Sequence, residues 1–486
     1  MRHTGHAGDE EQRRAPGPRG AARVELADGR APASGSLAAS GADESAAPIV
    51  RERAAHNVSR RDIDPDALKV LYHLSRNGYI AYLVGGGVRD LLLGRRPKDF
   101  DVGTNAHPKE IRRLFRNCFL IGRRFRLAHI RFGQKVIETS TFRRQPEVSA
   151  TEGAELYHHR DNTFGTPAED ARRRDFTING LFYDIRTFAV IDYVGGLEDL
   201  ERRTIRSIGD PNVRFREDPV RMLRAVRFAA RLGFEIEAET YAAILRHHGE
   251  IAKAAPARLL EEIYRLFAYR SGAGAFRLLR QTGLLADLFP ELDGWLAAAG
   301  SDCQLFWGLL EALDRRPEAG DEPPSPGLIF GSLLYPLLLH ERAARRRRGE
   351  EFHMADVERS LLRPVAERYR MPKRVFYEVL HMFDAQHRFE QPPRPAHAER
   401  WARHESFGPA LALRELYVQA TQGDRGLLAA WQQWRSAAER SIPLEHGWRR
   451  GEFRRGRRRR GRRRSAASAH GPVGETAGGA DARTPP

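Results

Sequence analysis

Two carboxylates separated by a single residue, Asp99 and Asp101, follow a run of three glycines at residues 85–87. Glycines between a strand and a helix let the backbone approach a ligand closely, and the start of the helix favours a phosphate group. On one strand, the two carboxylates would project from the same face, where a cation would offset their repulsion. Each feature alone also fits an ordinary turn or a solvated acidic pair. Together they predict a site for a phosphate compound and a metal.

Magnesium suits this pair because it prefers oxygen ligands and usually keeps water and substrate phosphate in its coordination shell. Two such ions activate an attacking hydroxyl and neutralise a leaving pyrophosphate, so the pattern indicates metal-dependent transfer of a nucleotide. A third carboxylate usually completes a two-metal site. Glu138, in the apolar segment 135–142, is a candidate if that segment pairs beside the Asp99 and Asp101 strand, but it could equally face solvent.

A charged segment at residues 169–179 holds two further candidates just before an apolar stretch. Arg174 could hold a triphosphate, and Asp175 could bind a ribose hydroxyl or join the catalytic carboxylates. The alternative is an ion-paired helix start that Asp175 caps.

A third group of residues lies at 216–228, where Asp218 followed by Pro219 predicts a helix N-cap and first helical residue. This helix would carry apolar residues on one side and arginines on another. Such a face could grip a nucleotide base and triphosphate through forked donors. A merely solvated face is the alternative, but it would usually mix in lysines and acids. The arginines are Arg221, Arg224, Arg227 and Arg231.

Strands and helices must position these residues, and the pattern from residue 81 to about 206 predicts a mixed α/β arrangement. Gly94 should close a helix, and Gly133 with Gln134 should turn a hairpin. Residues 145–165 show little periodicity, which predicts a mobile loop. The expected strands are 82–84, 100–102, 126–132 and 135–142, the expected helices are 88–93 and 108–115, and ordered structure resumes at 178–183 and 190–193.

After about residue 208 the apolar periodicity is helical, without an internal repeat of fixed period. Order should begin near residue 62, where apolar residues already recur at helical spacing. The expected later helices are 219–232, 257–267, 274–285, 305–313, 357–369 and 411–420.

The chain has 486 residues and a formal net charge of +17, which predicts several domains and a polyanionic partner. A composition rich in arginine would alone also give a basic chain. Two cysteines exclude a disulfide framework or a thiolate cluster and fit a reducing compartment. No signal peptide is evident. The apolar run at 328–339 is too short and interrupted for a membrane span, so a cytoplasmic protein without membrane contact is expected.

Four motifs together resemble the class II nucleotidyltransferases of the DNA polymerase β superfamily, which include bacterial poly(A) polymerases and tRNA CCA-adding enzymes. The match runs from about residue 59 to 239 and is specific, whereas the region to about 435 is similar only in its helical character. The motifs are residues 83–90 (LVGGGVRD), 99–101 (DFD), 173–179 (RRDFTIN) and 217–224 (EDPVRMLR).

The resemblance implies an α+β fold, with a small mixed-sheet nucleotidyltransferase head followed by all-helical neck, body and tail domains. Both ends of the chain lack apolar periodicity and are expected to be disordered. The implied division is 1–54 a disordered extension, 55–206 the catalytic head, 207–270 a helical neck and RNA-binding domain, 271–440 the helical body and tail, and 441–486 a disordered arginine-rich RNA-binding tail.

Within the class, the details resemble bacterial poly(A) polymerase I more than a CCA-adding enzyme. Residues 120–130 (LIGRRFRLAHI), residues 94–102 (GRRPKDFDV), the arginine-rich tail and the long extension before the head carry this likeness. The chain departs from the pattern after Thr151, where it is shorter than the best-known members, and at Gly103, where a threonine is more usual.

Roles for individual residues follow from the resemblance. Asp99 and Asp101 would bind two magnesium ions, and Asp175 would be the third acidic residue needed for activity. Asp218 and Arg221 would read the incoming base, although capping a helix would compete for the Asp218 carboxylate. The residues expected to contact ATP are Gly86, Arg89, Arg174, Arg221 and Arg224.

The resulting hypothesis is a template-independent polynucleotide adenylyltransferase, which adds AMP from ATP to the 3′ ends of single-stranded RNA with little sequence preference. Such polyadenylation of mRNA would promote RNA decay. One alternative is a tRNA CCA-adding nucleotidyltransferase, whose head would be nearly the same. The other is an RNA-binding protein with an inactive polymerase head, which the complete set of carboxylates and arginines argues against.

Overall fold

The computed structural model describes residues 47–122, 126–144, 163–298, 300, 303–316 and 323–440. The predicted extension up to residue 46, most of the predicted loop (145–162) and the arginine-rich tail from 441 lie outside the described residues. Among the described helices, none is both long enough and apolar enough to cross a membrane. The described residues divide into two compact units. The first holds those within 47–95, 100–174 and 180–195, and the second holds those within 96–99, 175–179 and 196–440.

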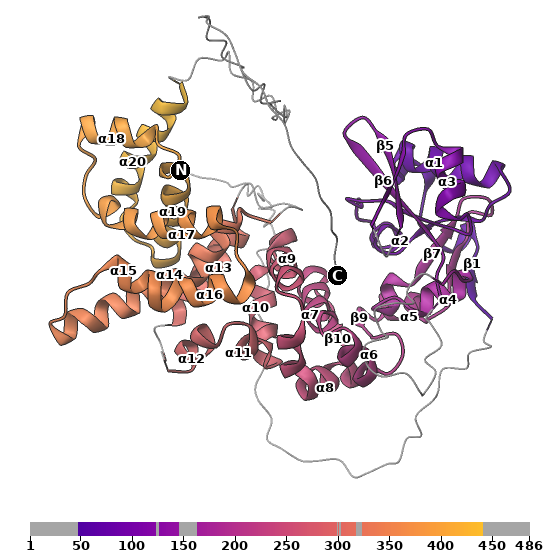
Figure 1. Cartoon of the computed structure of the whole chain (residues 1–486), viewed down its shortest axis with the longest axis horizontal. Helices are drawn as coiled ribbons and strands as arrows, with labels where there is room; N and C mark the ends of the chain where they lie inside the picture. The colour runs from indigo at the N-terminus through magenta and orange to yellow at the C-terminus, as the bar shows by residue number, and fades with distance from the viewer. Residues whose placement is uncertain are drawn as a thin grey trace, which may run out of the picture. The chain divides into compact units, whose positions relative to one another are not determined.

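The first unit is built on a mixed sheet in the order β1-β8-β7-β2-β3-β6-β5-β4, drawn in indigo to magenta in Figure 1. The pair β3 and β6 is parallel, and the other neighbouring strands are antiparallel. The strand before the glycine run, β2, therefore lies in the interior of the sheet. The strands are β1 Ile49–Arg51, β2 Ala81–Val84, β3 Asp101–Thr104, β4 Cys118–Ile121, β5 Leu127–Phe132, β6 Lys135–Thr141, β7 Leu181–Asp184 and β8 Val190–Asp192.

Two helices of the first unit, α1 and α4, begin at residues whose side chains cap them. Asp64 caps α1 through its carboxylate, which accepts a hydrogen bond from the Asp66 N–H, and Pro65 occupies the first helical position. The apolar side of α1 is buried and packs on β2 and β3. The helices are α1 Pro65–Arg76, α2 Gly86–Leu92, α3 Pro108–Leu114 and α4 Pro167–Arg172.

Most local predictions for this unit are confirmed, although β4 and α4 were not predicted. The hairpin of β5 and β6 turns at Gly133, whose φ of +62° is one that glycine adopts readily. The prediction that Asp99 and Asp101 share one strand is wrong, because β3 begins at Asp101. The strand β1 was not predicted and lies in the segment expected to be disordered. Its ladder partner β8 is far away in the sequence, so no local pattern indicates the pairing.

The second unit is helical, apart from a two-stranded parallel sheet of β9 (Thr204–Ile205) and β10 (Glu235–Ile236). The predicted α+β class is therefore confirmed, whereas the predicted domain boundaries stay predictions. The helices are α5 Gly196–Glu201, α6 Pro211–Glu217, α7 Val220–Leu232, α8 Ala238–His247, α9 Pro256–Leu266, α10 Gly272–Gln281, α11 Leu284–Leu288, α12 Pro290–Ala298, α13 Cys303–Asp314, α14 Pro326–Arg348, α15 Met354–Val357, α16 Arg363–Tyr369, α17 Lys373–Ala385, α18 Pro395–Ala402, α19 Phe407–Thr421 and α20 Arg425–Arg440.

Two of the predicted helices are interrupted. The helix expected at 274–285 breaks before Gly283, which has a φ of +79°. The helix expected at 357–369 contains a π-helical turn, Glu358–Leu362, between α15 and α16. The apolar run at 328–339 lies in α14 and is almost wholly buried, which confirms that it is core.

Candidate active site

The glycine run forms a sharp turn between the central strand β2 and the helix α2. Gly85 has φ +70° and ψ −130°, a conformation that residues with a Cβ atom rarely adopt. Its N–H donates to the carbonyl of Leu181 on β7 at 2.9 Å, which ties the turn to the sheet. The helix begins at Gly86, two residues earlier than predicted, so the glycines form its first turn.

Arg89 lies buried against this turn. A Cβ atom added at Gly86 would lie 3.4 Å from Nη2 of Arg89, so the guanidinium packs directly against the backbone of the turn. The Arg89 side chain is 2% exposed and is paired with Asp90, whose Oδ1 accepts a hydrogen bond from Nε at 2.8 Å. Arg89 therefore supports the turn from inside the fold rather than projecting into solvent.

Asp101 lies at the same end of the sheet as the glycine turn. In the antiparallel ladder of β2 and β3, Asp101 is opposite Val84, the residue just before Gly85. Its side chain is exposed, unlike those of the residues that follow it in β3. An exposed carboxylate is thus set beside a backbone turn suited to phosphate.

Glu138 lies on the strand next to Asp101. The parallel ladder pairs Val102 with Thr139, so Asp101 and Glu138 are each one residue earlier and project from the same face. Glu138 is exposed and lies across from His129 on β5, with 3.5 Å between Oε1 and Nε2.

These carboxylates fit magnesium rather than a metal held wholly by protein ligands. In the part of the chain that the structure describes, no three His, Cys, Asp or Glu side chains gather closely enough to hold a metal ion. Magnesium is commonly held by one or two carboxylates, with water and substrate phosphate completing its octahedron. Exposed oxygens such as those of Asp99 and Asp101 suit that arrangement.

Arg174 is held by an acidic residue of the preceding helix. Its Nε and Nη2 donate to Oδ2 of the buried Asp170 at 3.3 Å and 3.0 Å. Its guanidinium also lies 5.4 Å from the centroid of the Phe182 ring, and 22% of the side chain is exposed. The ion-paired alternative is thus what the structure shows at this position.

Asp175 does not cap a helix but is surrounded by donors within the second unit. Oδ1 accepts from the Phe176 N–H at 2.8 Å and from Nδ2 of Asn179 at 3.0 Å. Oδ2 accepts from Nε and Nη2 of Arg224 on α7 at 2.8 Å and 2.5 Å. Burial alone would raise the pKa of Asp175, but the Arg224 charge and these hydrogen bonds outweigh it and hold the pKa well below its usual range.

The arginine face of α7 packs against acids and rings rather than water. Glu262 on α9 is 5% exposed and contacts Arg224 at 3.4 Å and Arg227 at 3.0 Å. Burial lowers the pKa of Arg227 to about 10, although Glu262 opposes the shift. Arg231 lies over the Tyr269 ring, with its guanidinium carbon 3.6 Å from the centroid.

The predicted N-cap role of Asp218 is wrong. The side chain makes no capping hydrogen bond to α7, which begins at Val220. Both Asp218 oxygens instead accept from Arg258 on α9, Oδ1 from Nη1 at 3.0 Å and Oδ2 from Nη2 at 2.8 Å. A bidentate pair with a guanidinium is stronger than a single bond to a backbone N–H, which accounts for the choice.

Arg221, the predicted partner of Asp218 in reading a base, points to a different acid. Its Nη1 lies 3.7 Å from Oε2 of Glu217, which also accepts from Nη1 of Arg214 at 3.1 Å. Sequence reasoning missed Arg258 and Glu262. The available signal was Glu262 at an inward position of the helix predicted at 257–267, where an acid needs a basic partner.

Comparisons with known proteins converge on one family. Residues 81–206 match the family model described as poly A polymerase head domain, and 233–296 match that described as probable RNA and SrmB-binding site of polymerase A. Poly(A) polymerase I of Salmonella typhi is 41% identical over 412 residues, which are 82% of this chain and 86% of the relative. The Escherichia coli O6:H1 protein of that name is 46% identical over 316 residues, 63% of this chain and 67% of the relative.

A solved structure with lower sequence identity has a similar fold. The CCA-adding enzyme of Bacillus stearothermophilus, solved in complex with CTP, superposes with a TM-score of 0.56 and 27% sequence identity. The match covers 78% of this chain and 82% of that chain.

Proposed function

This chain belongs to the poly(A) polymerase I family, and we propose that it adds AMP from ATP to the 3′ ends of RNA without a template. The 3′ hydroxyl oxygen of RNA attacks the α-phosphorus of ATP, the bond to pyrophosphate breaks, and the hydroxyl proton is released. The register of β2 and β3 supports this function most directly, because it sets Asp101 opposite Val84, just before the glycine turn.

Asp99 and Asp101 would hold two magnesium ions together with the substrate phosphates. When bound, these ions would stabilise the charge that develops on the attacking oxygen and on the pyrophosphate. The exposed carboxylate of Asp101 lies at the edge of the turn. Glu138 lies beside Asp101 on the neighbouring strand and is the additional acid that could bind a metal ion.

The glycine turn would bind ATP phosphates through its backbone. Gly85 and Gly86 carry no side chain, so a phosphate can approach the backbone of the turn closely, although the N–H of Gly85 itself is bonded to Leu181. Arg89 would support this turn from inside the fold, where its guanidinium is buried and paired with the Asp90 carboxylate. Arg174, oriented by Asp170, would contribute its exposed part to the triphosphate.

Asp175 would serve as the third acidic residue needed for activity, and Arg224 would keep it ionised. Arg224 would bind ATP only if some of its donors remained available beside Asp175 and Glu262. Asp218 and Arg221 would read the base, with Arg258 setting the direction of the Asp218 carboxylate.

The protein would act on single-stranded RNA in the cytoplasm, where a reducing environment suits its free thiols at Cys118 and Cys303. The arginine-rich segment from residue 449, outside the described residues, would hold RNA with little sequence preference. For single strands, each phosphate neutralised in this way contributes a slope of roughly 0.7 to the fall of log affinity with log salt.

One assay separates this function from its rivals. The purified chain is incubated with magnesium and each NTP in turn, on a generic RNA and on a tRNA lacking its 3′ end. Long products with ATP alone on generic RNA are expected. A requirement for CTP and arrest after three additions would identify a CCA-adding enzyme, and retention of RNA without incorporation would identify a binding protein.

A further inference from the structure

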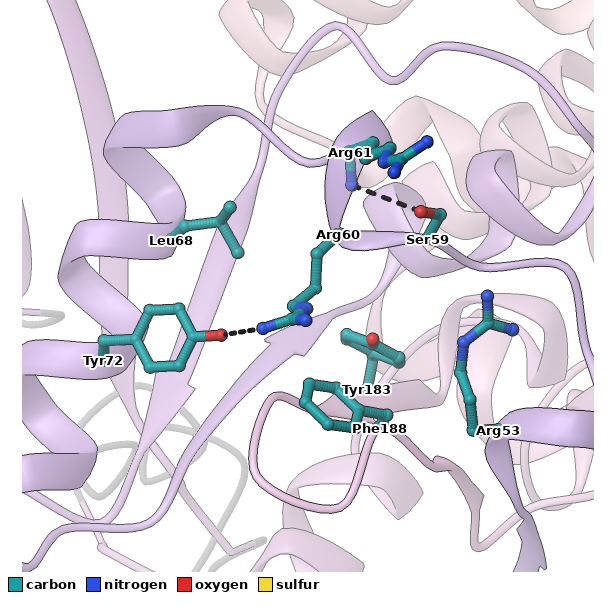
Figure 2. Close-up of a pocket in the computed structure, with 8 residues that line it drawn as sticks. All are labelled: Arg53, Ser59, Arg60, Arg61, Leu68, Tyr72, Tyr183 and Phe188. Carbon is teal, nitrogen blue, oxygen red and sulfur yellow. Dashed lines mark hydrogen bonds between the residues drawn. The ribbon is translucent and has the colours of Figure 1, made fainter.

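A pocket of about 540 Å³ opens in the first unit, away from the glycine turn. Figure 2 shows its lining, which combines arginines with aromatic rings and contains no carboxylate. Its volume is in the range of small-ligand sites. The lining residues are Arg53, Ser59, Arg60, Arg61, Leu68, Tyr72, Tyr183 and Phe188.

Strand register separates this pocket from the candidate active site. The glycine turn bonds to Leu181 at the start of β7, whereas Phe188 lies in the connection that follows the other end of that strand, between β7 and β8. Tyr82, at the opposite end of β2 from the turn, pairs with Asp184. The pocket is therefore built at the far end of these strands.

The centre of the pocket is a fixed stack of Arg60 on Phe188. The guanidinium carbon of Arg60 lies 4.5 Å from the ring centroid, and Nη1 donates to Oη of Tyr72 at 2.9 Å (Figure 2). Phe188 has a φ of +59°, which is uncommon for a bulky residue, and its carbonyl is 2.9 Å from Nε2 of His56. Backbone strain of this kind persists where the surroundings impose it, and it gathers at binding sites.

Two further arginines of the lining carry charge that no acid offsets within the described residues. Arg53 and Arg61 are both exposed, and in the described part of the chain neither forms an ion pair with a carboxylate. The polar contact made by the Arg53 side chain is to the carbonyl of His56 at 3.0 Å. Both arginines line the same pocket, and a guanidinium group suits a phosphate, which it binds with forked donors.

We propose that this pocket binds one nucleotide unit of a single-stranded RNA. Arg53 and Arg61 hold the backbone phosphate, and the base stacks on the Arg60 and Phe188 platform. Proteins commonly recognise unpaired RNA in this way, by arginine contacts to the backbone and by stacking of bases on aromatic rings and guanidinium planes. The proposal rests on the proposed function for its substrate class, but it concerns a second contact outside the reacting site.

The test measures binding of a fluorescent 20-nucleotide oligoadenylate to the full chain by anisotropy, from 0.1 to 0.4 M salt. The variant Arg53→Ala/Arg61→Ala should bind about 5- to 20-fold more weakly, with a salt slope smaller by about 0.7, the contribution of one phosphate. The matched control is Arg112→Ala/Arg113→Ala, which removes two exposed arginines of α3 in the same unit. An affinity and slope equal to those of this control would overturn the proposal.

A second variant tests the stacked base separately. Arg60→Lys keeps the charge but removes the planar group, so affinity should fall by about 5-fold or more while the salt slope stays unchanged. Displacement of the oligoadenylate by AMP at equal concentration would instead identify a site for free nucleotides. Binding needs no catalysis, and each variant should retain the wild-type KM for ATP. Failure of the unmodified chain to incorporate AMP would therefore count against the proposed function alone.

Discussion

Asp175 and Arg224 are joined by two hydrogen bonds to one oxygen, since Nε and Nη2 of Arg224 both donate to Oδ2 of Asp175, at 2.8 Å and 2.5 Å. The other oxygen accepts from the Phe176 N–H and from Asn179. The carboxylate proposed to be essential for catalysis thus also links the 175–179 segment to helix α7. Its loss should affect both the reaction and the fold.

Asp175→Asn should abolish AMP incorporation and destabilise the second unit. The amide leaves Arg224 largely buried with one carboxylate partner fewer, and breaking a buried pair commonly costs about 3–5 kcal/mol. Urea unfolding at pH 7 measures this loss. Asp62→Asn, at an exposed position of the first unit, is the control and should change the free energy of unfolding by less than about 0.5 kcal/mol.

The same pair predicts a dependence of stability on pH. The pKa of Asp175 in the folded chain is held below its ordinary value, so the pair stabilises the fold fully above the unfolded pKa of about 3.9. This contribution is lost as the pH falls below about 4 toward the folded pKa. The gap in unfolding free energy between the wild type and Asp175→Asn should therefore shrink in acid. A gap of equal size at pH 7 and pH 3 would contradict the assignment.

Asp101→Ala should abolish incorporation and leave RNA binding intact, because the exposed side chain is not part of the core.

Glu138→Gln should have a graded effect. If Glu138 shares the metal with Asp101, the variant should need several-fold more magnesium for half-maximal activity, as a neutral amide binds the ion more weakly. An unchanged magnesium titration would mean that Glu138 serves only as the neighbour of His129.

Local signals predicted the hairpin at Gly133, the apolar side of α1 and the buried run in α14, because each depends on residues close in the sequence. The partners of the site residues could not be predicted in this way. Arg258 and its partner Asp218 are 40 residues apart in the sequence, and Arg224 and its partner Asp175 are 49 residues apart. The Asp-Pro signal before α7 was also misleading, because a side chain with a choice of partners takes the charged, bidentate one.

Gly103 lies in β3, two residues after Asp101, at the position where the resemblance led us to expect threonine. A Cβ atom there would lie 2.7 Å from Cε1 of Phe142 and 2.9 Å from Cγ1 of Val84, both of which are buried. Gly103→Thr should therefore destabilise the first unit by about 1–3 kcal/mol, and Gly103→Ala by a smaller amount. The two losses are read from urea unfolding curves.

The matched control for this substitution is Gly294→Ala in α12, where an added Cβ atom meets nothing within 4 Å. Alanine there should stabilise the helix by up to about 1 kcal/mol. A gain of stability in Gly103→Thr would mean that Phe142 moves aside freely, so that glycine at this position is not required by packing.

Arg258→Ala should alter the choice of nucleotide without unfolding the protein. Arg258 is 55% exposed, so its removal leaves no cavity, but it frees the Asp218 carboxylate from its bidentate contact. If Asp218 reads the base, loss of its fixed orientation should lower the ratio of kcat/KM for ATP over CTP by about 10-fold, the equivalent of about 1.4 kcal/mol. Single-nucleotide incorporation with each NTP gives this ratio.

The control for that experiment is Arg277→Ala, which removes an arginine of similar exposure paired with Glu311, far along the chain from the proposed base-reading residues. Asp218→Asn provides the complementary variant, since it keeps the shape of the side chain and loses its charge. If Asp218→Asn changes the ATP preference and Arg258→Ala does not, the carboxylate reads the base without help from Arg258. If the double variant Asp218→Asn/Arg258→Ala changes the preference no more than either single variant does, the two residues act as one unit, because effects of coupled residues are not additive.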